Sequence, residues 1–464
     1  MSNNKHWSAK ERIEYLLDEN SFVEIGALVT KRNTDFNLPQ MDAPSDGVIT
    51  GYGVIDYNPV YVYSQDVSVI NGTIGEMHAK KIATLYDMAM KVGAPVIGIL
   101  DCGGLRLQEA TDALAALGSI YTKQIKASGI IPQITAVVGN CGGGEAIISA
   151  ISDFTFITKK DAKLYVNAPN TIKNNHESKV DTASALFKAE SGNVDFLCED
   201  EEDLFTKVRE LVTYLPTNNE DDHSYEECMD DINRANDITV SSDANVLLAS
   251  IADEGKVFEV KKEYAGNMVT AFVRLNGCTV GMIANNDDNK LTANACDKAQ
   301  RFVKICDAFN IPFVTLTSTT GYKSCVCGEK RIGANVAKLV CSFAEATVPK
   351  INVVVGNSYG SAYVAMNSKH IGADMEFAWP DVEISTMEAD MAAKIMYADE
   401  KDVKVIDEKG EEYASIQGAS ESAAKRGYVD AIIAPEATRK NLIYALEMLF
   451  TKKEDRFSKK HGTL

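Results

Sequence analysis

The amino-acid sequence predicts an α/β fold that is built twice in one chain of 464 residues. Landmarks of the first half recur in the second half at a constant offset of 217 positions (360 − 143, for example). The recurring pairs are Ala94-Pro95 with Ile311-Pro312, Gly104 with Gly321, Ile131-Pro132 with Val348-Pro349, Gly139-Asn140 with Gly356-Asn357, and Gly143 with Gly360. In both halves short, wholly apolar segments alternate with helix-period segments, which is typical of parallel strands covered by helices.

Each half opens with an amphipathic helix followed by a β-hairpin. The apolar helix faces contain Ile13, Leu16 and Leu17 in the first half and Leu248, Ile251 and Ala252 in the second half. The hairpins are predicted over 48–63, with a turn at 56–59, and over 272–283, with a turn at Asn276-Gly277. The opening helices are offset by 235 positions (253 − 18), so the first half holds 18 extra residues. This excess falls in a polar stretch at 31–46, which is predicted to be a loop.

After the hairpin, each half is predicted to continue as helix, buried strand, glycine turn, helix, second buried strand, second glycine turn and helix. The predicted helices after the hairpins cover 74–92 and 293–309, the first buried strands cover 96–100 and 313–316, and the second buried strands cover 134–138 and 351–355. Wholly apolar strands of this length favour a parallel sheet that is buried on both faces.

The boundary between the halves is predicted near residue 235, which gives domains of residues 1–235 and 236–464. The formal net charge is −19, and the stretch from Glu199 to Asp231 holds 13 acidic and 2 basic residues. More than half of the net charge therefore lies in this one stretch. Runs of like charge are usually solvated, so the stretch is interpreted as a linker and an exposed helix surface.

Composition excludes several classes of function. Hydrophobic residues make up 45% of the chain and charged residues 24%, which is typical of globular proteins. No apolar run is long enough to span a membrane, and the first residues lack the apolar core of a signal peptide, so a cytoplasmic protein is expected. There is no basic stripe with aromatics, which excludes nucleic-acid binding. The ten cysteines form no Cys-x-x-Cys pair, so no metal site is expected.

The second glycine turn of each half is the main candidate for chemistry. Residues 139–146 read Gly-Asn-Cys-Gly-Gly-Gly-Glu-Ala, and residues 356–363 read Gly-Asn-Ser-Tyr-Gly-Ser-Ala-Tyr. Glycine lets a backbone approach a ligand closely, and N–H groups at a helix start can hold an oxyanion. The alternative is a tight packing turn. The first turn, with Gly103, Gly104 and Arg106, combines N–H groups with a cation, which suits a phosphorylated or thioester ligand.

These motifs resemble the carboxyltransferase subunit of biotin-dependent acyl-CoA carboxylases and decarboxylases, a branch of the crotonase superfamily. The resemblance covers nearly the whole chain. It rests on residues 75–82 (Gly-Glu-Met-His-Ala-Lys-Lys-Ile), 103–109, 127–134, 141–144, 344–350, 359–363, 368–374 and 459–463. It implies two tandem crotonase-type (ClpP/crotonase) ββα-spiral domains, the first on the acyl-CoA side and the second on the biotin side.

The resemblance also implies an activity and its site residues. A carboxyl group would move between a short-chain acyl-CoA of the malonyl or methylmalonyl type and biotin, through an enolate-like intermediate. The amides of Gly143 and Gly144 would hold the acyl-CoA carbonyl oxygen. The amides of Ser361 and Ala362, which Gly360 lets the ligand approach, would hold the biotin ureido oxygen. The remaining candidates for binding the two ligands are Gly103, Gly104 and Tyr359 in the turns and, for the CoA phosphates, His78, Lys80, Lys81 and Arg106.

The implied partners are a biotin carboxyl carrier protein, and either a biotin carboxylase or a membrane sodium-pump decarboxylase subunit, through which the chain would reach a membrane. Biotin must come on another polypeptide, because the chain has no Met-Lys-Met acceptor motif. A homo-hexamer is implied, with the active site between the first half of one subunit and the second half of another.

Two other interpretations stay open. In a crotonase-type acyl-CoA hydratase or isomerase, Glu145 or Glu109 would be the acid/base. A catalytically reduced assembly subunit is the other interpretation. It is favoured by one departure from the family pattern: the Arg-His-Gly-Ala-Lys run and the long Pro-Gly loop of the second half are absent, and residues 319–327 read Thr-Thr-Gly-Tyr-Lys-Ser-Cys-Val-Cys.

Overall fold

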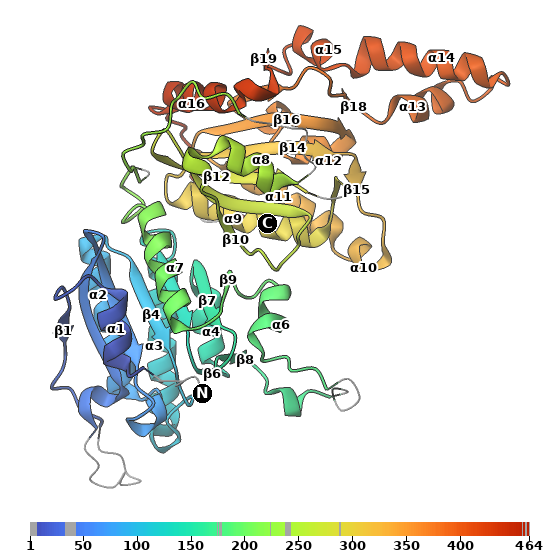
Figure 1. Cartoon of the computed structure of the whole chain (residues 1–464). Helices are drawn as coiled ribbons and strands as arrows, with labels where there is room; N and C mark the ends of the chain where they lie inside the picture. Colours follow the sequence, from blue (N-terminus) through green and yellow to red (C-terminus); the bar gives the residue numbers. More distant parts are fainter. Residues whose placement is uncertain are drawn as a thin grey trace, which may run out of the picture. The chain divides into compact units, whose positions relative to one another are not determined.

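The computed structural model describes residues 7–32, 43–173, 175, 179–222, 224–236, 243–286, 289–456, 458–459 and 462–463. The chain divides into two compact units, Met1–Asp222 and His223–Leu464, and each has its own sheet and core (Figure 1). Of the predicted loop at 31–46, residues 33–42 lie outside the described residues, as do Lys460 and His461 of the C-terminal motif. No helix of the described residues is both long enough and apolar enough to cross a membrane.

The first unit is built on a seven-stranded sheet in the order β1-β2-β3-β4-β5-β7-β9. Its strands are β1 (Val23–Ile25), β2 (Val48–Ile55), β3 (Asn58–Gln65), β4 (Val96–Leu100), β5 (Gln133–Val137), β7 (Phe154–Thr158) and β9 (Phe196–Cys198). The first three strands are antiparallel, and all strands from β3 to β9 run parallel. Every residue of β4, β5 and β7 is buried, as a parallel sheet covered by helices requires.

Helices carry the chain between these parallel strands. The helices of the first unit are α1 (Ala9–Leu16), α2 (Glu76–Val92), α3 (Ala110–Ala127), α4 (Glu145–Ile151), α6 (Ala185–Glu190) and α7 (Glu201–Tyr214). Ile82 and Leu85 of α2 share one core cluster with Ile120 of α3. A small parallel pair, β6 (Asn140–Gly142) and β8 (Lys163–Tyr165), lies beside the main sheet and leads directly into α4. This pair positions the first candidate turn.

The second unit repeats this plan. Its main sheet has the order β10-β11-β12-β14-β16-β17-β19, with β18 paired to β16. The strands are β10 (Phe258–Val260), β11 (Met268–Leu275), β12 (Cys278–Asn285), β14 (Phe313–Thr319), β16 (Lys350–Tyr359), β17 (Met375–Ala378), β18 (Ile384–Ser385) and β19 (Ala431–Ile432). Strands β10 to β12 are antiparallel and the rest parallel, as in the first unit. A separate pair joins β13 (Lys290–Leu291) to β15 (Gly321–Tyr322).

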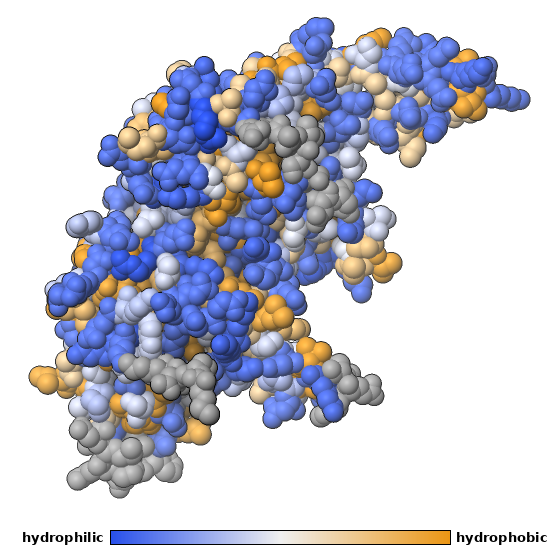
Figure 2. Space-filling model, in the orientation of Figure 1, coloured by the Kyte–Doolittle hydropathy of each residue, from blue (hydrophilic) through white to orange (hydrophobic). Residues whose placement is uncertain are grey.

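The helices of the second unit also follow the order of the first, with additions. They are α8 (Ala244–Ile251), α9 (Ala293–Ala308), α10 (Val326–Glu329), α11 (Ile332–Glu345), α12 (Gly360–Ala365), α13 (Ala389–Met396), α14 (Val403–Tyr413), α15 (Ser420–Lys425) and α16 (Thr438–Leu449). Figure 1 shows α13 and α14 side by side at the edge of this unit. Figure 2 shows apolar residues among the charged surface of this helical pair. Met391, Ile395 and Met396 of α13 are each more than half exposed.

The predicted duplication is confirmed element by element. Both hairpins close through two residues with positive φ, Asp56 and Tyr57 in the first unit and Asn276 and Gly277 in the second. Such turns match the right-handed twist of the strands that they join. The strand predicted at 96–100 is β4 exactly. Two predictions differ: the first hairpin turn is shorter than 56–59, because β3 begins at Asn58, and Gly356-Asn357 is not a turn, because β16 continues through it to Tyr359 and pairs with β18.

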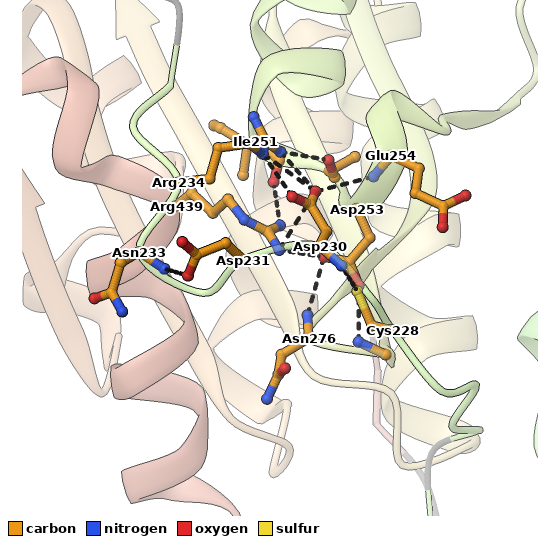
Figure 3. A network of polar contacts seen from close by, with 12 residues as sticks. Cys228, Asp230, Asp231, Asn233, Arg234, Ile251, Asp253, Glu254, Asn276 and Arg439 are labelled. Atoms are coloured by element: carbon orange, nitrogen blue, oxygen red, sulfur yellow. Dashed lines mark hydrogen bonds and ion pairs between the residues drawn. The ribbon is translucent and has the colours of Figure 1, made fainter.

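Part of the acidic stretch is held against the second unit rather than free in solvent (Figure 3). Arg234 forms an ion pair with Asp230 and donates to two backbone carbonyls of the opening helix region. Arg439, which is fully buried, forms an ion pair with Asp253 at 2.6 Å and lies 3.7 Å from Asp230. Tyr225 also forms a β-bridge with Cys278. The chain therefore joins the second unit soon after Asp222, before the predicted boundary near 235.

Candidate active site

The first candidate turn is formed where the small β6–β8 pair meets α4. Gly143 has φ +64°, a left-handed conformation that favours glycine, and a Cβ placed there would meet no atom within 4 Å. The backbone is therefore bent sharply while the space beside it stays open. A hydrogen bond from α3 stabilises the turn: the hydroxyl of Tyr121 donates to the Gly144 carbonyl at 2.5 Å.

The structure corrects the predicted pair of donors in this turn. The N–H of Gly143 already donates to the Tyr165 carbonyl oxygen at 2.8 Å, because β6 pairs with β8. Gly143 therefore gives the turn its shape and is not itself a donor to a ligand. Gly144 precedes α4, and the first N–H groups of a helix have no acceptor within the helix. The N–H of Gly144 has no protein acceptor among the described residues.

The second candidate turn lies at the end of β16 and borders a cavity. Gly360 has φ +62°, starts α12 and is followed by the exposed Ser361 and the buried Ala362. The cavity has a volume of about 590 Å³. Its lining consists of Lys290, Thr320, Gly321, Tyr322, Asn357, Tyr359, Gly360, Ser361, Ala362, Thr386, Met387, Glu388 and Met391. The structure thus brings all four predicted residues of this turn, 359–362, to one cavity.

Hydrogen bonds fix the walls of this cavity. The hydroxyl of Tyr322 donates to Oγ of Ser361 at 3.2 Å, and the hydroxyl of Tyr359 donates to Oε2 of Glu383 at 2.6 Å. Burial raises the pKa of Tyr359 well above its usual value, so its hydroxyl stays protonated. Sequence reasoning missed Tyr322, Lys290 and Glu388. They come from three separate segments that only the folded sheet brings together, and no local motif marks them.

The predicted first turn at Gly103 and Gly104 is occupied by its own hydrogen bonds. Gly103 donates its N–H to the Asn71 carbonyl at 2.8 Å, and Gly104 donates to Sγ of Cys102 at 3.2 Å. The Gly104 carbonyl accepts from Ile74. These bonds correct the prediction that the turn offers free N–H groups to a ligand. Gly104 has φ +99°, a backbone conformation that favours glycine.

Arg106 belongs to a buried ion-pair cluster and does not face solvent. Its Nη1 lies 2.7 Å from Oδ1 of Asp46 and 2.9 Å from Oε1 of Glu109, and its Nη2 donates to the Thr73 carbonyl. The three charged side chains are fully buried. The prediction that Arg106 binds a CoA phosphate is therefore corrected. Glu109, held by the same guanidinium, is equally unavailable as an acid/base.

His78 and Lys81 are also internal. His78 is fully buried, its Nδ1 lies 3.0 Å from the Asp46 carbonyl, and burial lowers its pKa to about 3, so it is neutral. Lys81 donates to the carbonyls of Ser45 and Val48, and burial lowers its pKa to about 8. Both predicted phosphate contacts are corrected. Of the four predicted cations, only Lys80 of α2 has an exposed side chain.

Glu145 lies behind the first turn, inside the protein. It is 2% exposed, and Nε2 of Gln65 donates to its carboxyl group. Burial raises its pKa to about 7. Its counterpart in the second unit, at the same offset of 217, is the buried Ala362, which has no titratable group. The position after the glycine turn therefore does not need a carboxylate in both units.

Comparison with known proteins identifies the class. The model of the carboxyl transferase domain family matches residues 4–464. Methylmalonyl-CoA decarboxylase subunit alpha of Veillonella parvula is 39% identical over 474 residues, which cover 98% of this chain and 92% of that protein. Propionyl-CoA carboxylase beta chain of Roseobacter denitrificans is 38% identical over 475 residues, with 98% and 93% covered.

A solved structure agrees with this result. The crystal structure of transcarboxylase 12S, described as a hexamer assembly with hydrolysed methylmalonyl-coenzyme A bound, matches with a TM-score of 0.94. Its sequence is 37% identical, and the match covers 98% of this chain and 92% of that chain. This chain thus has the fold of a carboxyltransferase, a duplicated crotonase-type α/β fold with a glycine turn in each unit. The chain belongs to the carboxyl transferase family of acyl-CoA carboxylases and decarboxylases, as the motifs predicted.

Proposed function

We propose that this chain transfers a carboxyl group between a short-chain acyl-CoA of the malonyl or methylmalonyl type and biotin carried on a partner protein. The observation that carries the proposal is the paired geometry of Gly143 and Gly360, each left-handed and each at or just before the start of a short helix. Carboxyl transfer develops negative charge on two oxygens, one on each reactant. Two sets of backbone donors are what such a reaction needs.

On the acyl-CoA side, the first unit would hold the thioester oxygen as the α-carbon becomes enolate-like. The free N–H of Gly144 is the donor that supports this role, and Gly143 leaves the space for the carbonyl to approach. Among the predicted cations, Lys80 would meet the CoA phosphates. Preorganised donors of this kind are worth several kcal/mol in the transition state because they need not reorganise.

On the biotin side, the cavity of the second unit fits a small bicyclic ring in size, and it has N–H groups at a helix start on one wall. When bound, biotin supplies the nitrogen that carries the carboxyl group. The amides of Ser361 and Ala362 would hold the ureido oxygen, and Tyr322 would fix the orientation of Ser361 through its hydrogen bond. Burial of Ala362 keeps this donor set rigid.

The chain would act as a homo-hexamer with a biotin carboxyl carrier protein, and with a biotin carboxylase or a membrane decarboxylase subunit as a further partner. Exposed apolar side chains on α13, namely Met391, Ile395 and Met396, support an interface there, since contiguous apolar surface favours association. Transcarboxylase 12S is described as a hexamer. The proposed location is the cytoplasm.

The proposal is tested by following methylmalonyl-CoA and malonyl-CoA with and without free biotin or a biotinylated carrier. Carboxyl loss that requires biotin is the expected result. Turnover that is independent of biotin and is abolished by Glu145→Gln would favour a hydratase or isomerase instead. Absence of acyl-CoA binding in a folded protein would favour an assembly subunit.

A further inference from the structure

Two exposed cysteines lie close together on the segment that replaces the family's longer loop. Cys325 caps the N-terminus of α10, and Cys327 lies within this helix. Their Sγ atoms are 3.3 Å apart. Most of the other cysteines are buried and all lie apart from this pair in the sequence. The two thiols thus form a close pair on the protein surface.

The backbone of this segment allows the two sulfurs to bond. A disulfide needs an S–S distance of about 2.05 Å and Cα atoms within about 7 Å. Consecutive Cα atoms are about 3.8 Å apart, so the Cα atoms of residues two positions apart are at most slightly more than about 7 Å apart. The start of a helix brings these two Cα atoms closer together. The two sulfur atoms need to approach each other only from 3.3 Å to about 2.05 Å.

The surroundings favour a nucleophilic thiol at Cys327. Its pKa is lowered, chiefly by the hydrogen bond from Cys325, with a smaller contribution from the charge of Lys330. The N–H of Gly328 points at Sγ of Cys325 at 3.3 Å. An exposed thiol with a lowered pKa is the kind that attacks disulfides, whereas buried thiols such as Cys102 and Cys141, whose pKa values are raised by burial, are inert.

We propose that Cys325 and Cys327 form a thiol–disulfide exchange site that reacts with small disulfides of the glutathione class. The thiolate of Cys327 attacks one sulfur of the disulfide RSSR, which forms a mixed disulfide and releases RS⁻. The thiol of Cys325 loses its proton and attacks Sγ of Cys327, which closes the intramolecular disulfide and releases the second RS⁻. The two cysteines are oxidised, and RSSR is reduced to two thiols.

The cysteine pair follows a cavity-lining residue closely along the chain. Tyr322, which lines the cavity and donates to Ser361, is three positions before Cys325, and Lys323 donates its N–H to the Leu291 carbonyl at 2.9 Å. Ring closure pulls on the segment between this anchor and α10. Oxidation should therefore weaken binding on the cavity side without changing binding at the first unit. This consequence rests on the proposed function, whereas the exchange reaction itself does not.

The reaction is tested on the full-length protein equilibrated with mixtures of reduced and oxidised glutathione, followed by acid quenching and peptide mass analysis. The expected product is one peptide that contains both cysteines and has lost two hydrogen atoms. In Cys325→Ser the mixed disulfide on Cys327 should accumulate instead, because the second step is blocked. Cys341→Ser, a partly exposed single cysteine, is the matched control and should leave the pair's oxidation unchanged.

Two results would overturn the exchange site. One is a pair that stays reduced while Cys228, Cys278 or Cys341 takes up glutathione. The other is a wild-type protein that carries two separate glutathione adducts at equilibrium. The effect on the cavity is measured separately, as KM for free biotin and KM for acyl-CoA in the oxidised and reduced protein. We expect oxidation to raise KM for biotin severalfold and to leave KM for acyl-CoA unchanged. Equal KM values for biotin in the oxidised and reduced protein would contradict an effect of the disulfide on the cavity. A reduced protein without any biotin-dependent turnover would refute the proposed function, while the mass measurement would still decide the exchange site.

Discussion

Gly143 and Gly360 adopt the same left-handed backbone conformation at equivalent places in the two units, with φ values of +64° and +62°. Each glycine directly follows a β segment, β6 or β16, and lies at or just before the start of a short helix, and the two are 217 positions apart. A left-handed residue costs about 1–2 kcal/mol when it carries a Cβ. Both units therefore have, at equivalent positions, a turn that favours glycine, which supports a shared role for the turn.

Alanine at these glycines should separate function from folding. Gly143→Ala adds a methyl group into open space, so we expect a loss of only about 1–2 kcal/mol in the free energy of unfolding. The same methyl group should exclude the thioester oxygen and lower kcat/KM for acyl-CoA by about a hundredfold, as loss of an oxyanion donor does. Gly360→Ala should instead raise KM for biotin. Urea unfolding and steady-state kinetics measure both effects.

The matched control is Gly118→Ala in the middle of α3, where a Cβ also meets nothing within 4 Å but φ is not positive. Helix propensity predicts that this change is neutral or stabilises by up to about 1 kcal/mol, with activity unchanged. If Gly143→Ala behaves like Gly118→Ala, the turn has no part in catalysis.

Replacement of Arg106 should lower stability, whereas replacement of Lys80 should weaken CoA binding. Arg106→Met leaves Asp46 and Glu109 buried without their cation, so we expect a loss of about 3–5 kcal/mol in unfolding free energy. Lys80→Ala should leave stability unchanged and weaken CoA binding in a way that fades at high salt. Lys91→Ala, another exposed lysine of α2, is the control for binding. Calorimetry of CoA binding that shows no loss for Lys80→Ala would remove this residue from the site.

The pH dependence of stability should reveal the buried carboxyl of Glu145. Its pKa is raised by burial from 4.5 to about 7, so the folded protein holds a proton that the unfolded chain releases. The stabilisation is fully present below pH 4.5 and is lost as the pH rises to about 7. The pKa of buried His78 is lowered from 6.5 to about 3, so its contribution to stability increases as the pH rises from about 3 to 6.5. Only a comparison of variants therefore isolates the contribution of Glu145.

Glu145→Gln replaces the carboxyl with a group that stays neutral. We expect this variant to show a smaller decline in stability between pH 4.5 and about 7 and to be more stable than the wild type at pH 8, while buried Glu376, whose pKa is also raised to about 7, keeps its own part of the decline. Glu190→Gln at the exposed end of α6 should leave the profile unchanged. Biotin-dependent turnover should persist in Glu145→Gln. An unchanged pH profile in this variant would show that the carboxyl is solvated.

Assembly should depend on the apolar side chains of α13. Ile395→Glu places a charge among Met391 and Met396, and burial of that charge in an interface costs several kcal/mol, so we expect a smaller oligomer by light scattering. Lys394→Ala on the same helix is exposed and should leave the assembly intact. A hexamer that survives Ile395→Glu would place the subunit contact elsewhere on the surface.

The sequence predicted the fold well because its signals are local. The strand at 96–100 is an unbroken apolar run, and the observed β4 has the same bounds. The extension of β16 to Tyr359 was not predictable, because it depends on pairing with β18, which lies further along the chain. The turn at Asn276-Gly277 was predicted at its observed place, whereas the turn predicted at 56–59 is only Asp56-Tyr57, because β3 begins at Asn58.

The site was harder to predict because burial decides the role of a charge. Arg106 and Lys81 have residue types suited to phosphate, yet tertiary packing surrounds both with internal acceptors. The register of β6 with β8 likewise takes the N–H of Gly143, which sequence alone does not reveal. The four predicted residues of the second turn line one cavity together because they are consecutive, and their role in binding stays a prediction. Tyr322 was missed because only the pairing of β15 with β13 brings it there.

Biotin-dependent carboxyl transfer is tested most directly by carboxyl loss from methylmalonyl-CoA, measured with and without biotin, in the wild type and in Gly360→Ala. We expect turnover that requires biotin, saturates with it, and needs a higher biotin concentration in Gly360→Ala, while KM for the acyl-CoA stays unchanged. Turnover at the same rate without biotin, or equal biotin dependence in the two proteins, would contradict this expectation.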